Sequence, residues 1–243
     1  MNVYIWTSGV LKNDYIGERK PFTPWADTVA YYPFNWNMND SSWNNRNLSV
    51  AQWTFTYWAL SWWAKYVQTN FNSYSSQISN FPLNSNSATI SFWMSFVYWT
   101  AWNWNTSSTY WASVFDLVWS NNVLRPVLSW LYNSSLRYWF WYINTVNQTE
   151  FYVPSVSESW HLYTIVCNWW TASIYIDWAL RKTWTYTVQN WYGFILNTVA
   201  WNSTQKRDYS SRDKLSELIF ENRQWTAQEI SNYYNLTKSN YWL

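Results

Sequence analysis

Glycine is almost absent from this chain, with three residues among 243. Cysteine and histidine occur once each, as Cys167 and His161. A single cysteine excludes an intrachain disulfide, and a single histidine excludes a metal site built from several histidines. We interpret Cys167 as a core residue, because a free cysteine within an apolar run is usually buried. We interpret His161 as a side chain at a sheet position, and any Ser-His-Asp triad would depend on this one histidine.

Charged residues are scarce as well. They make up 12% of the chain, with a formal net charge of +2, whereas soluble proteins contain roughly 25%. This balance gives no electrostatic reason to expect nucleic acid or an anionic membrane as partner. No run of 18 apolar residues predicts membrane insertion, and the N-terminus lacks the basic start and apolar core of a signal peptide. We therefore expect that the chain either is not exported by that route or is a fragment.

Tryptophan is abundant where glycine is missing, with 26 residues. Tight hairpins need residues with positive φ, which glycine adopts without steric cost and tryptophan does not. Many of the tryptophans nevertheless lie in Asn- and Ser-rich segments that predict turns. Such segments are 35–37, 42–44, 61–64, 101–105, 168–171 and 177–178.

We therefore hypothesise an alternative genetic code, in which one stop codon encodes glycine and the printed sequence renders it as tryptophan. A short internal repeat supports this, because Tyr-Ile-Trp at 4–6 recurs as Tyr-Ile-Gly at 15–17. The alternative is a protein genuinely rich in tryptophan, whose aromatic clusters would offer stacking surfaces for sugar rings. Trp93, Trp160 and Trp225 are expected to be genuine, because two lie in strand patterns and the third precedes a helix that it would staple.

Short alternating runs predict an all-β protein. Strands are expected over 28–34, 54–57, 65–67, 89–98, 113–118, 127–132, 137–143, 150–153, 161–167, 173–176, 183–188, 194–197 and 215–221. Many short strands with turn signals between them are typical of a sandwich or a closed barrel. One helix is predicted over 227–235, where Thr226 and Glu229 form a capping box. Its buried face is expected to consist of Ile230, Tyr233 and Tyr234.

Four segments within residues 27–235 carry a family resemblance when the turn tryptophans are read as glycine. They are 30–44, 90–93, 160–163 with 174–178, and 215–223 with 226–230. In order and spacing they resemble the laminin G-like members of the concanavalin A-like lectin/glucanase superfamily. The resemblance implies a two-sheet antiparallel jelly-roll sandwich with one short C-terminal helix, whose first and last strands are neighbours. We assign 1–26 to a leader segment or short hairpin, 27–237 to the laminin G-like jelly-roll domain and 238–243 to a tail.

The resemblance also implies one cofactor, a structural calcium ion. Related domains often hold calcium between the opening loop and the closing strand, where this chain has Asp40, Asn37 and Glu217. Hard oxygen ligands of this kind suit calcium. The alternative is that Asp40 caps its own turn as an Asx motif.

Hydrolases with this fold resemble one another in carrying acidic residues at alternate positions of one strand. The nearest match here is Glu217 and Glu221, with Ile219 where a middle carboxylate would stand. This incomplete pattern does not supply the two catalytic roles, so we expect a protein that is not an enzyme. Glycoside hydrolysis is the least favoured function.

The expected function is a non-catalytic recognition module that binds glycan or protein on a cell or particle surface. Its expected location is therefore extracellular, cell-surface or virion-associated. A structural or assembly component of a phage tail or surface appendage is the alternative, with residues 1–26 as an attachment arm. The sequence assigns neither the ligand-binding residues nor the oligomeric state, because this fold hosts many functions and its loops vary most.

Overall fold

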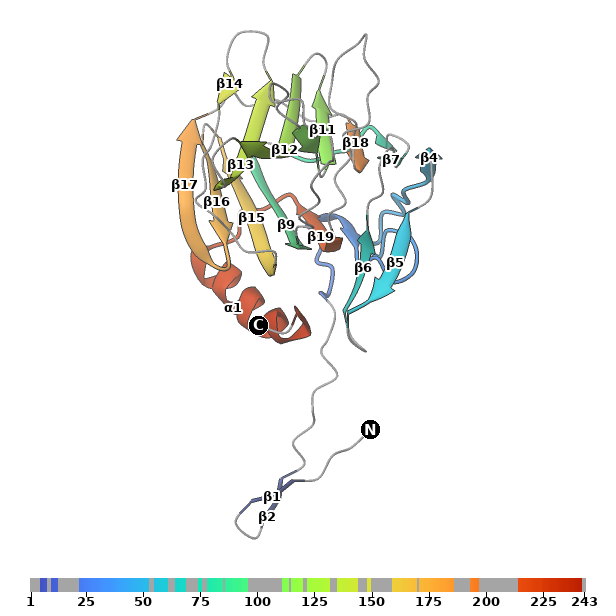
Figure 1. Ribbon diagram of the computed structural model, residues 1–243, viewed down its shortest axis with the longest axis vertical. Coiled ribbons are helices and arrows are strands. Elements are labelled where there is room, and N and C mark those ends of the chain that lie inside the picture. The colour runs from blue at the N-terminus through green and yellow to red at the C-terminus, as the bar shows by residue number, and fades with distance from the viewer. Residues whose placement is uncertain are drawn as a thin grey trace.

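The computed structural model shows a mostly antiparallel β-sheet protein with one short α-helix near its C-terminus (Figure 1). The residues that the structure describes are 5–7, 10–12, 22–52, 55–60, 64–68, 74–75, 78–84, 86–95, 111–113, 115–119, 122–131, 135–143, 148–149, 159–169, 171–185, 193–196 and 214–241. The predicted strand over 150–153 lies outside them. The all-β sandwich expected from the sequence is confirmed.

One sheet, here called the major sheet, has the strand order β17-β16-β15-β9-β19-β6-β5, and β3 also pairs with β19. The bounds are β3 (Thr28–Tyr32), β5 (Thr56–Ala59), β6 (Lys65–Gln68), β9 (Ser87–Ser95), β15 (Trp160–Asn168), β16 (Thr171–Ile176), β17 (Ala179–Thr185) and β19 (Lys214–Glu221). All of these pairs are antiparallel. The pairing of β3 with β19 confirms that the first and last strands of the predicted domain are neighbours.

The second sheet, here called the minor sheet, has the order β14-β13-β12-β11-β18-β8, with β10 paired to β12. The bounds are β8 (Ile78–Ser79), β10 (Trp111–Ser113), β11 (Phe115–Trp119), β12 (Asn122–Leu131), β13 (Ser135–Ile143), β14 (Gln148–Thr149) and β18 (Gly193–Leu196). Two short pairs complete the described strands: β1 (Ile5–Thr7) with β2 (Val10–Lys12), and β4 (Val50–Gln52) with β7 (Tyr74–Ser75). The predicted domain boundaries near residues 26 and 237 stay predictions.

The core lies between the two sheets and is rich in aromatic side chains. Phe194 of the minor sheet contacts Phe220 of the major sheet, with 4.8 Å between ring centroids. Alternation along β16 turns Ala172, Ile174 and Ile176 to this core, as expected of a strand with one buried face. Cys167 belongs to the same cluster, which confirms its interpretation as a core residue.

The helix α1 (Ala227–Thr237) covers the outer face of the major sheet (Figure 1). Its capping box is present, because the Glu229 N–H donates to Thr226 Oγ1 at 3.2 Å and the Thr226 N–H donates to Glu229 Oε2 at 2.7 Å. Ile230 packs in a cluster with Trp225 and Ile219, so the predicted staple is confirmed. A 3₁₀-helix, η1 (Lys238–Tyr241), follows within the segment assigned to a tail. No helix in the described residues is long and apolar enough to cross a membrane.

The tryptophans of the described segments divide by burial. Trp93, Trp160 and Trp225, which the sequence marks as genuine, are all buried. Those in predicted turns are exposed, for example Trp43, whose exposed fraction is 78%. The predicted turn residues Trp62, Trp63, Trp102, Trp104 and Trp170 lie outside the described residues.

Removing the helix cap should destabilise the protein without changing its fold. We expect Thr226→Ala to lower the free energy of unfolding by about 1 kcal/mol, because the Glu229 N–H loses its acceptor. Urea denaturation followed by circular dichroism measures this loss. Gln228→Ala, in the same helical turn at an exposed position, is the control and should change stability by less than about 0.5 kcal/mol. Equal effects of the two substitutions would contradict a capping role for Thr226.

Candidate functional site

The loop after β3 is organised around the carboxylate of Asp40. Its Oδ1 accepts hydrogen bonds from the N–H groups of Tyr31 at 2.9 Å and Ser42 at 2.8 Å. Its Oδ2 accepts from the Ser42 hydroxyl at 2.8 Å and from the Arg46 N–H at 2.9 Å. Four donors match the roughly four lone-pair sites of a carboxylate. The Asx turn that the sequence offers as the alternative to a metal ligand is therefore present, from Asp40 to the Ser42 N–H.

This loop covers the edge of β3 that faces away from β19. The Ser41 N–H donates to the Tyr31 carbonyl at 2.7 Å, and the Arg46 guanidinium donates to the Val29 carbonyl at 2.6 Å. The Asn44 amide donates to the Thr28 carbonyl at 2.8 Å. An edge strand with unpaired main-chain groups invites association with other strands, so these contacts protect the edge.

Asn37 belongs to the same loop but uses its side-chain oxygen locally. Its Oδ1 accepts from the Asn39 N–H at 2.9 Å. The N–H of Asp40 donates to Asn47 Oδ1 at 2.9 Å. The two predicted ligands on this loop therefore each have a partner within the loop.

Glu217 lies on the closing strand β19, at a bulge where the register with β9 shifts. Its backbone has a φ of 49°, which turns its side chain towards α1. Its Oε2 accepts the Tyr233 hydroxyl at 2.7 Å. Burial raises the pKa of Tyr233 well above its ordinary value, and the negative charge of Glu217 is the second largest cause. Tyr233 thus remains a neutral donor to the carboxylate.

The structure does not join Asp40 and Glu217 in one cluster. Asp40 lies along the outer edge of β3, while Glu217 lies in the neighbouring strand on the other side of β3. Adjacent strands are about 5 Å apart, so two strand spacings amount to about 10 Å. Among the described residues, no group of three or more His, Cys, Asp or Glu side chains is arranged to hold a metal ion. Calcium at this loop stays a prediction.

Glu221, the second acid of the alternate pair, is fully buried beneath the helix. Its Oε1 accepts the Thr28 hydroxyl at 3.2 Å, and its Oε2 accepts the indole N–H of Trp225. The Arg223 guanidinium lies 2.9 Å from the same Oε2. Alternation does place Glu217, Ile219 and Glu221 on one side of β19, as the sequence indicates, but that side faces α1. Both carboxylates therefore hold the helix and the closing turn to the sheet.

His161 takes part in a contact that the sequence analysis missed. Its Nδ1 lies 2.5 Å from Asp177 Oδ2, and its Nε2 lies 3.1 Å from Ser159 Oγ. Asp177 Oδ1 also accepts the Leu162 N–H at 3.0 Å, while the Asp177 N–H donates to the Leu162 carbonyl at 2.9 Å. The carboxylate thus fastens the β16–β17 turn to β15. Only the antiparallel register of β15 and β16 brings these residues together, and no short motif signals it.

The Ser159–His161–Asp177 order is that of a nucleophile, its base and an orienting acid. A hydrolase also needs preorganised donors for the oxyanion at a shaped cleft. Asp177 already makes two hydrogen bonds with the main chain of Leu162, which gives its contact with His161 a structural role. We therefore assign it to the packing of the major sheet.

Comparison with known proteins places the fold. No family model and no curated protein matches the sequence. Among solved structures, the chain is similar to domain 4 of AbnA, a GH43 extracellular arabinanase from Geobacillus stearothermophilus, which was solved in complex with arabinotriose. The TM-score is 0.66 at 15% identity, over 85% of this chain and 97% of that domain.

Two toxin binding domains are similar as well. The match to the binding domain of Paraclostridial Mosquitocidal Protein 1 has a TM-score of 0.60 at 15% identity and covers 86% of this chain and 52% of that one. The match to the botulinum neurotoxin serotype G binding domain has a TM-score of 0.60 at 13% identity, over 87% and 51%. This chain spans about half the length of these toxin domains. At such identities the comparisons establish a shared β-sandwich fold, and membership of the laminin G-like group stays a prediction.

The buried carboxyl of Glu221 makes stability depend on pH. Burial raises its pKa, and the hydrogen bond from Trp225 and the charge of Arg223 oppose this shift only in part. The folded state thus favours the neutral carboxyl of Glu221. The neutral carboxyl stabilises the fold fully below the ordinary pKa of glutamate, and this stabilisation is lost as the pH rises through the raised pKa. Glutamine stays neutral at every pH, so we expect the Glu221→Gln variant to lose less stability than the wild type when the pH is raised from about 4 to about 7. Thermal melting at each pH measures this loss.

Glu229→Gln is the control for this pH dependence. The pKa of Glu229 is lowered, chiefly by its hydrogen bond from the Thr226 N–H. The charged carboxylate of Glu229 stabilises the fold above the ordinary pKa of glutamate, and this stabilisation is lost as the pH falls through the lowered pKa. The Glu229→Gln variant should therefore lose less stability than the wild type when the pH is lowered, the opposite of the effect at Glu221. Parallel pH profiles of the wild type and the Glu221→Gln variant would contradict the raised pKa of Glu221 as the source of the pH dependence.

Proposed function

We propose that this chain is a non-catalytic recognition module that binds glycan, displayed on a cell or particle surface. The observation that carries the proposal is the match to a complete arabinanase domain that was solved with a bound trisaccharide. The matches to toxin binding domains support recognition as the general role. An extracellular, cell-surface or virion-associated location follows from such a partner.

The placement of the acidic residues supports a binding role over hydrolysis. A glycosidase needs two carboxylates that flank a bond of the sugar, one of them as acid. Glu217 and Glu221, the nearest match to such a pair in the sequence, are both buried. Each already accepts hydrogen bonds from side chains of the helix or the closing turn. A sugar therefore has no access to this pair in the folded protein.

A glycan array, followed by calorimetric titration with each hit and with arabinotriose, tests the proposal. We expect saturable binding to at least one oligosaccharide, and sugars that are recovered uncleaved after prolonged incubation. Glu217→Gln should retain this binding, because its side chain lies beneath α1. A fluorophosphonate probe should leave Ser159 unlabelled. Binding of no glycan would contradict the proposal, and cleavage or labelling would contradict its non-catalytic part.

A structural or assembly component is the second candidate function. The sequence observation in its favour is the Tyr-Ile repeat at 4–6 and 15–17, within the segment 1–26 that would serve as the attachment arm. In the described part of this segment, β1 pairs with β2. Size-exclusion chromatography with light scattering separates the two candidates. An ordered oligomer that lacks glycan binding supports assembly, and a monomer that binds glycan supports recognition.

We also propose that the loop 37–44 binds a structural calcium ion. Its oxygen-bearing side chains and main-chain carbonyls are of the type that calcium prefers. A cation at Asp40 must replace some of the four hydrogen-bond donors of that carboxylate. We expect calcium to raise the melting temperature relative to chelator, and Asp40→Ala to abolish this rise. Identical melting in calcium and in chelator would leave Asp40 with its turn role alone.

A further inference from the structure

The turn between β16 and β17 has a geometry that calls for glycine. Ile176 pairs with Ala179, so Asp177 and Trp178 form a two-residue turn. Their φ angles are both positive, 50° for Asp177 and 71° for Trp178. A two-residue turn with positive φ at both positions is a type I′ turn, in which Asp-Gly is among the strongly preferred pairs. Tryptophan stands where that pair has glycine.

The turn between β15 and β16 repeats this situation. Asn168 pairs with Thr171, which makes Trp169 the first of two turn residues. Trp169 has a φ of 50°, and its exposed fraction is 59%. Positive φ at the first turn position is typical of the primed hairpin turns, where glycine and asparagine dominate.

A third such position follows β3. Trp36 has a φ of 66°, and its N–H donates to the Phe34 carbonyl at 2.8 Å in a tight bend. The residue is 54% exposed. The Lys65 ammonium lies 5.6 Å from the ring centroid, a cation–π contact of the exposed kind that contributes little.

Positive φ is sterically unfavourable for a residue with a large side chain, because Cβ approaches the following carbonyl oxygen. The other described residues with positive φ have an explanation. Asn45, Asn80 and Asp177 are of types that tolerate this region. Phe34 and Glu217 have buried side chains whose contacts offset the strain. Trp36, Trp169 and Trp178 are each more than half exposed, so burial offers no such compensation.

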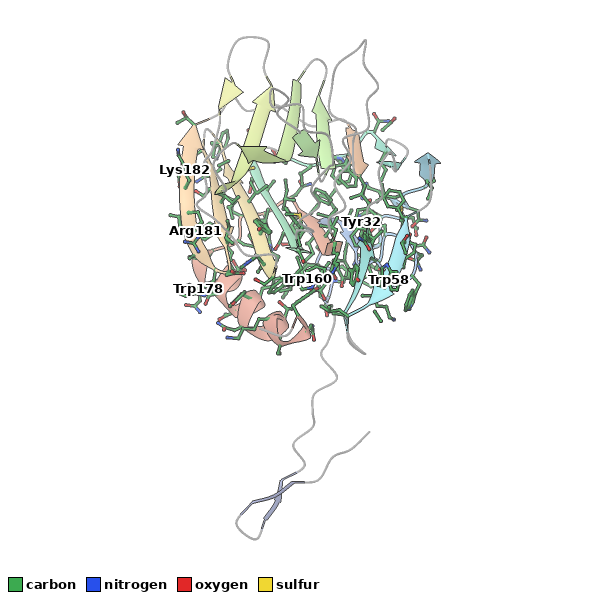
Figure 2. The ribbon with its side chains drawn as sticks, viewed as in Figure 1. Tyr32, Trp58, Trp160, Trp178, Arg181 and Lys182 are labelled. Carbon is green, nitrogen blue, oxygen red and sulfur yellow. The ribbon has the colours of Figure 1, made fainter. Side chains whose placement is uncertain are left out.

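Three other tryptophans show what the indole does when the fold uses it. Trp93, Trp160 and Trp225 are 0%, 6% and 5% exposed, and none has positive φ. The Trp93 indole N–H donates to Thr237 Oγ1 at 3.1 Å, and its ring stacks on Tyr241 with 4.1 Å between centroids. In Figure 2, Trp160 lies within the body of the protein, whereas Trp178 lies at its periphery.

We propose that positions 36, 169 and 178 carry glycine in the protein as its own cells make it. Their codon would be read there as glycine, whereas the codon at positions 93, 160 and 225 specifies tryptophan. This inference does not rest on the proposed function, but it bears on it. The exposed indoles at these three turns are then no part of a sugar-stacking surface, and glycan recognition runs through other groups.

The gene sequence gives the first test. We expect one codon at positions 36, 169 and 178, and a different codon at 93, 160 and 225. A single codon shared by all six positions would overturn the proposal.

Peptide mass spectrometry of the protein isolated from its own cells gives the second test. We expect glycine at positions 36, 169 and 178 in the same sample that shows tryptophan at 93, 160 and 225. The second group is the internal control, because it establishes that the peptides are read correctly. Tryptophan at the first three positions would overturn the proposal regardless of the codons.

Thermal melting tests the physical argument separately, on recombinant protein with the printed sequence. Trp36→Gly, Trp169→Gly and Trp178→Gly should each raise the melting temperature by about 2–4 °C, the shift that relief of one strained residue gives in a chain of this size. Trp93→Gly, Trp160→Gly and Trp225→Gly are the matched controls and should lower it, because each leaves a cavity. A fall in melting temperature in the first group would contradict the strain on which the proposal rests.

Discussion

The burial of β19 on both faces is the constraint on which the rest of the structure depends. Leu218 and Phe220 point into the core between the sheets, while Ile219 points towards α1. The strand pairs with β9 on one side and with β3 and β6 on the other. It thereby joins β9 to β3 and β6 within the major sheet and supplies part of the surface on which the helix packs. The acidic residues of this strand serve the same end, since each accepts hydrogen bonds from the groups that hold the helix or the closing turn.

Much of the fold could be predicted because local and tertiary signals agree. Alternation predicted most strands, and the capping box predicted the start of α1 at its observed residue, Ala227. The structure extends the strand expected over 127–132 back to Asn122, where Pro126 interrupts the local strand pattern but pairing with β13 overrides it. The bulge at Glu217 could not be predicted, because it arises from a register shift against β9. The contact of His161 with Asp177 likewise depends on register, which one sequence does not encode in a motif.

The candidate site shows why residue type alone is a weak guide to function on this fold. Asp40, Glu217 and Glu221 are the acids that a search for calcium or catalysis selects. All three accept hydrogen bonds that hold an edge strand, a helix or a turn in place. The proposed recognition role draws instead on the whole sandwich, which is similar to a domain solved in complex with arabinotriose. Binding experiments, rather than acidic motifs, are then the way to test this proposed role.

The burial of Cys167 has a practical consequence for such experiments. This residue is the only cysteine in the chain, and its side chain is 1% exposed in the core. A thiol reagent added to the folded protein therefore finds no accessible native target. A cysteine introduced at any surface loop would be modified selectively by a maleimide fluorophore or spin label. Each loop can thus be tested in turn for the proposed sugar binding, from the change in the label's signal when sugar is added, because Cys167 contributes no background labelling.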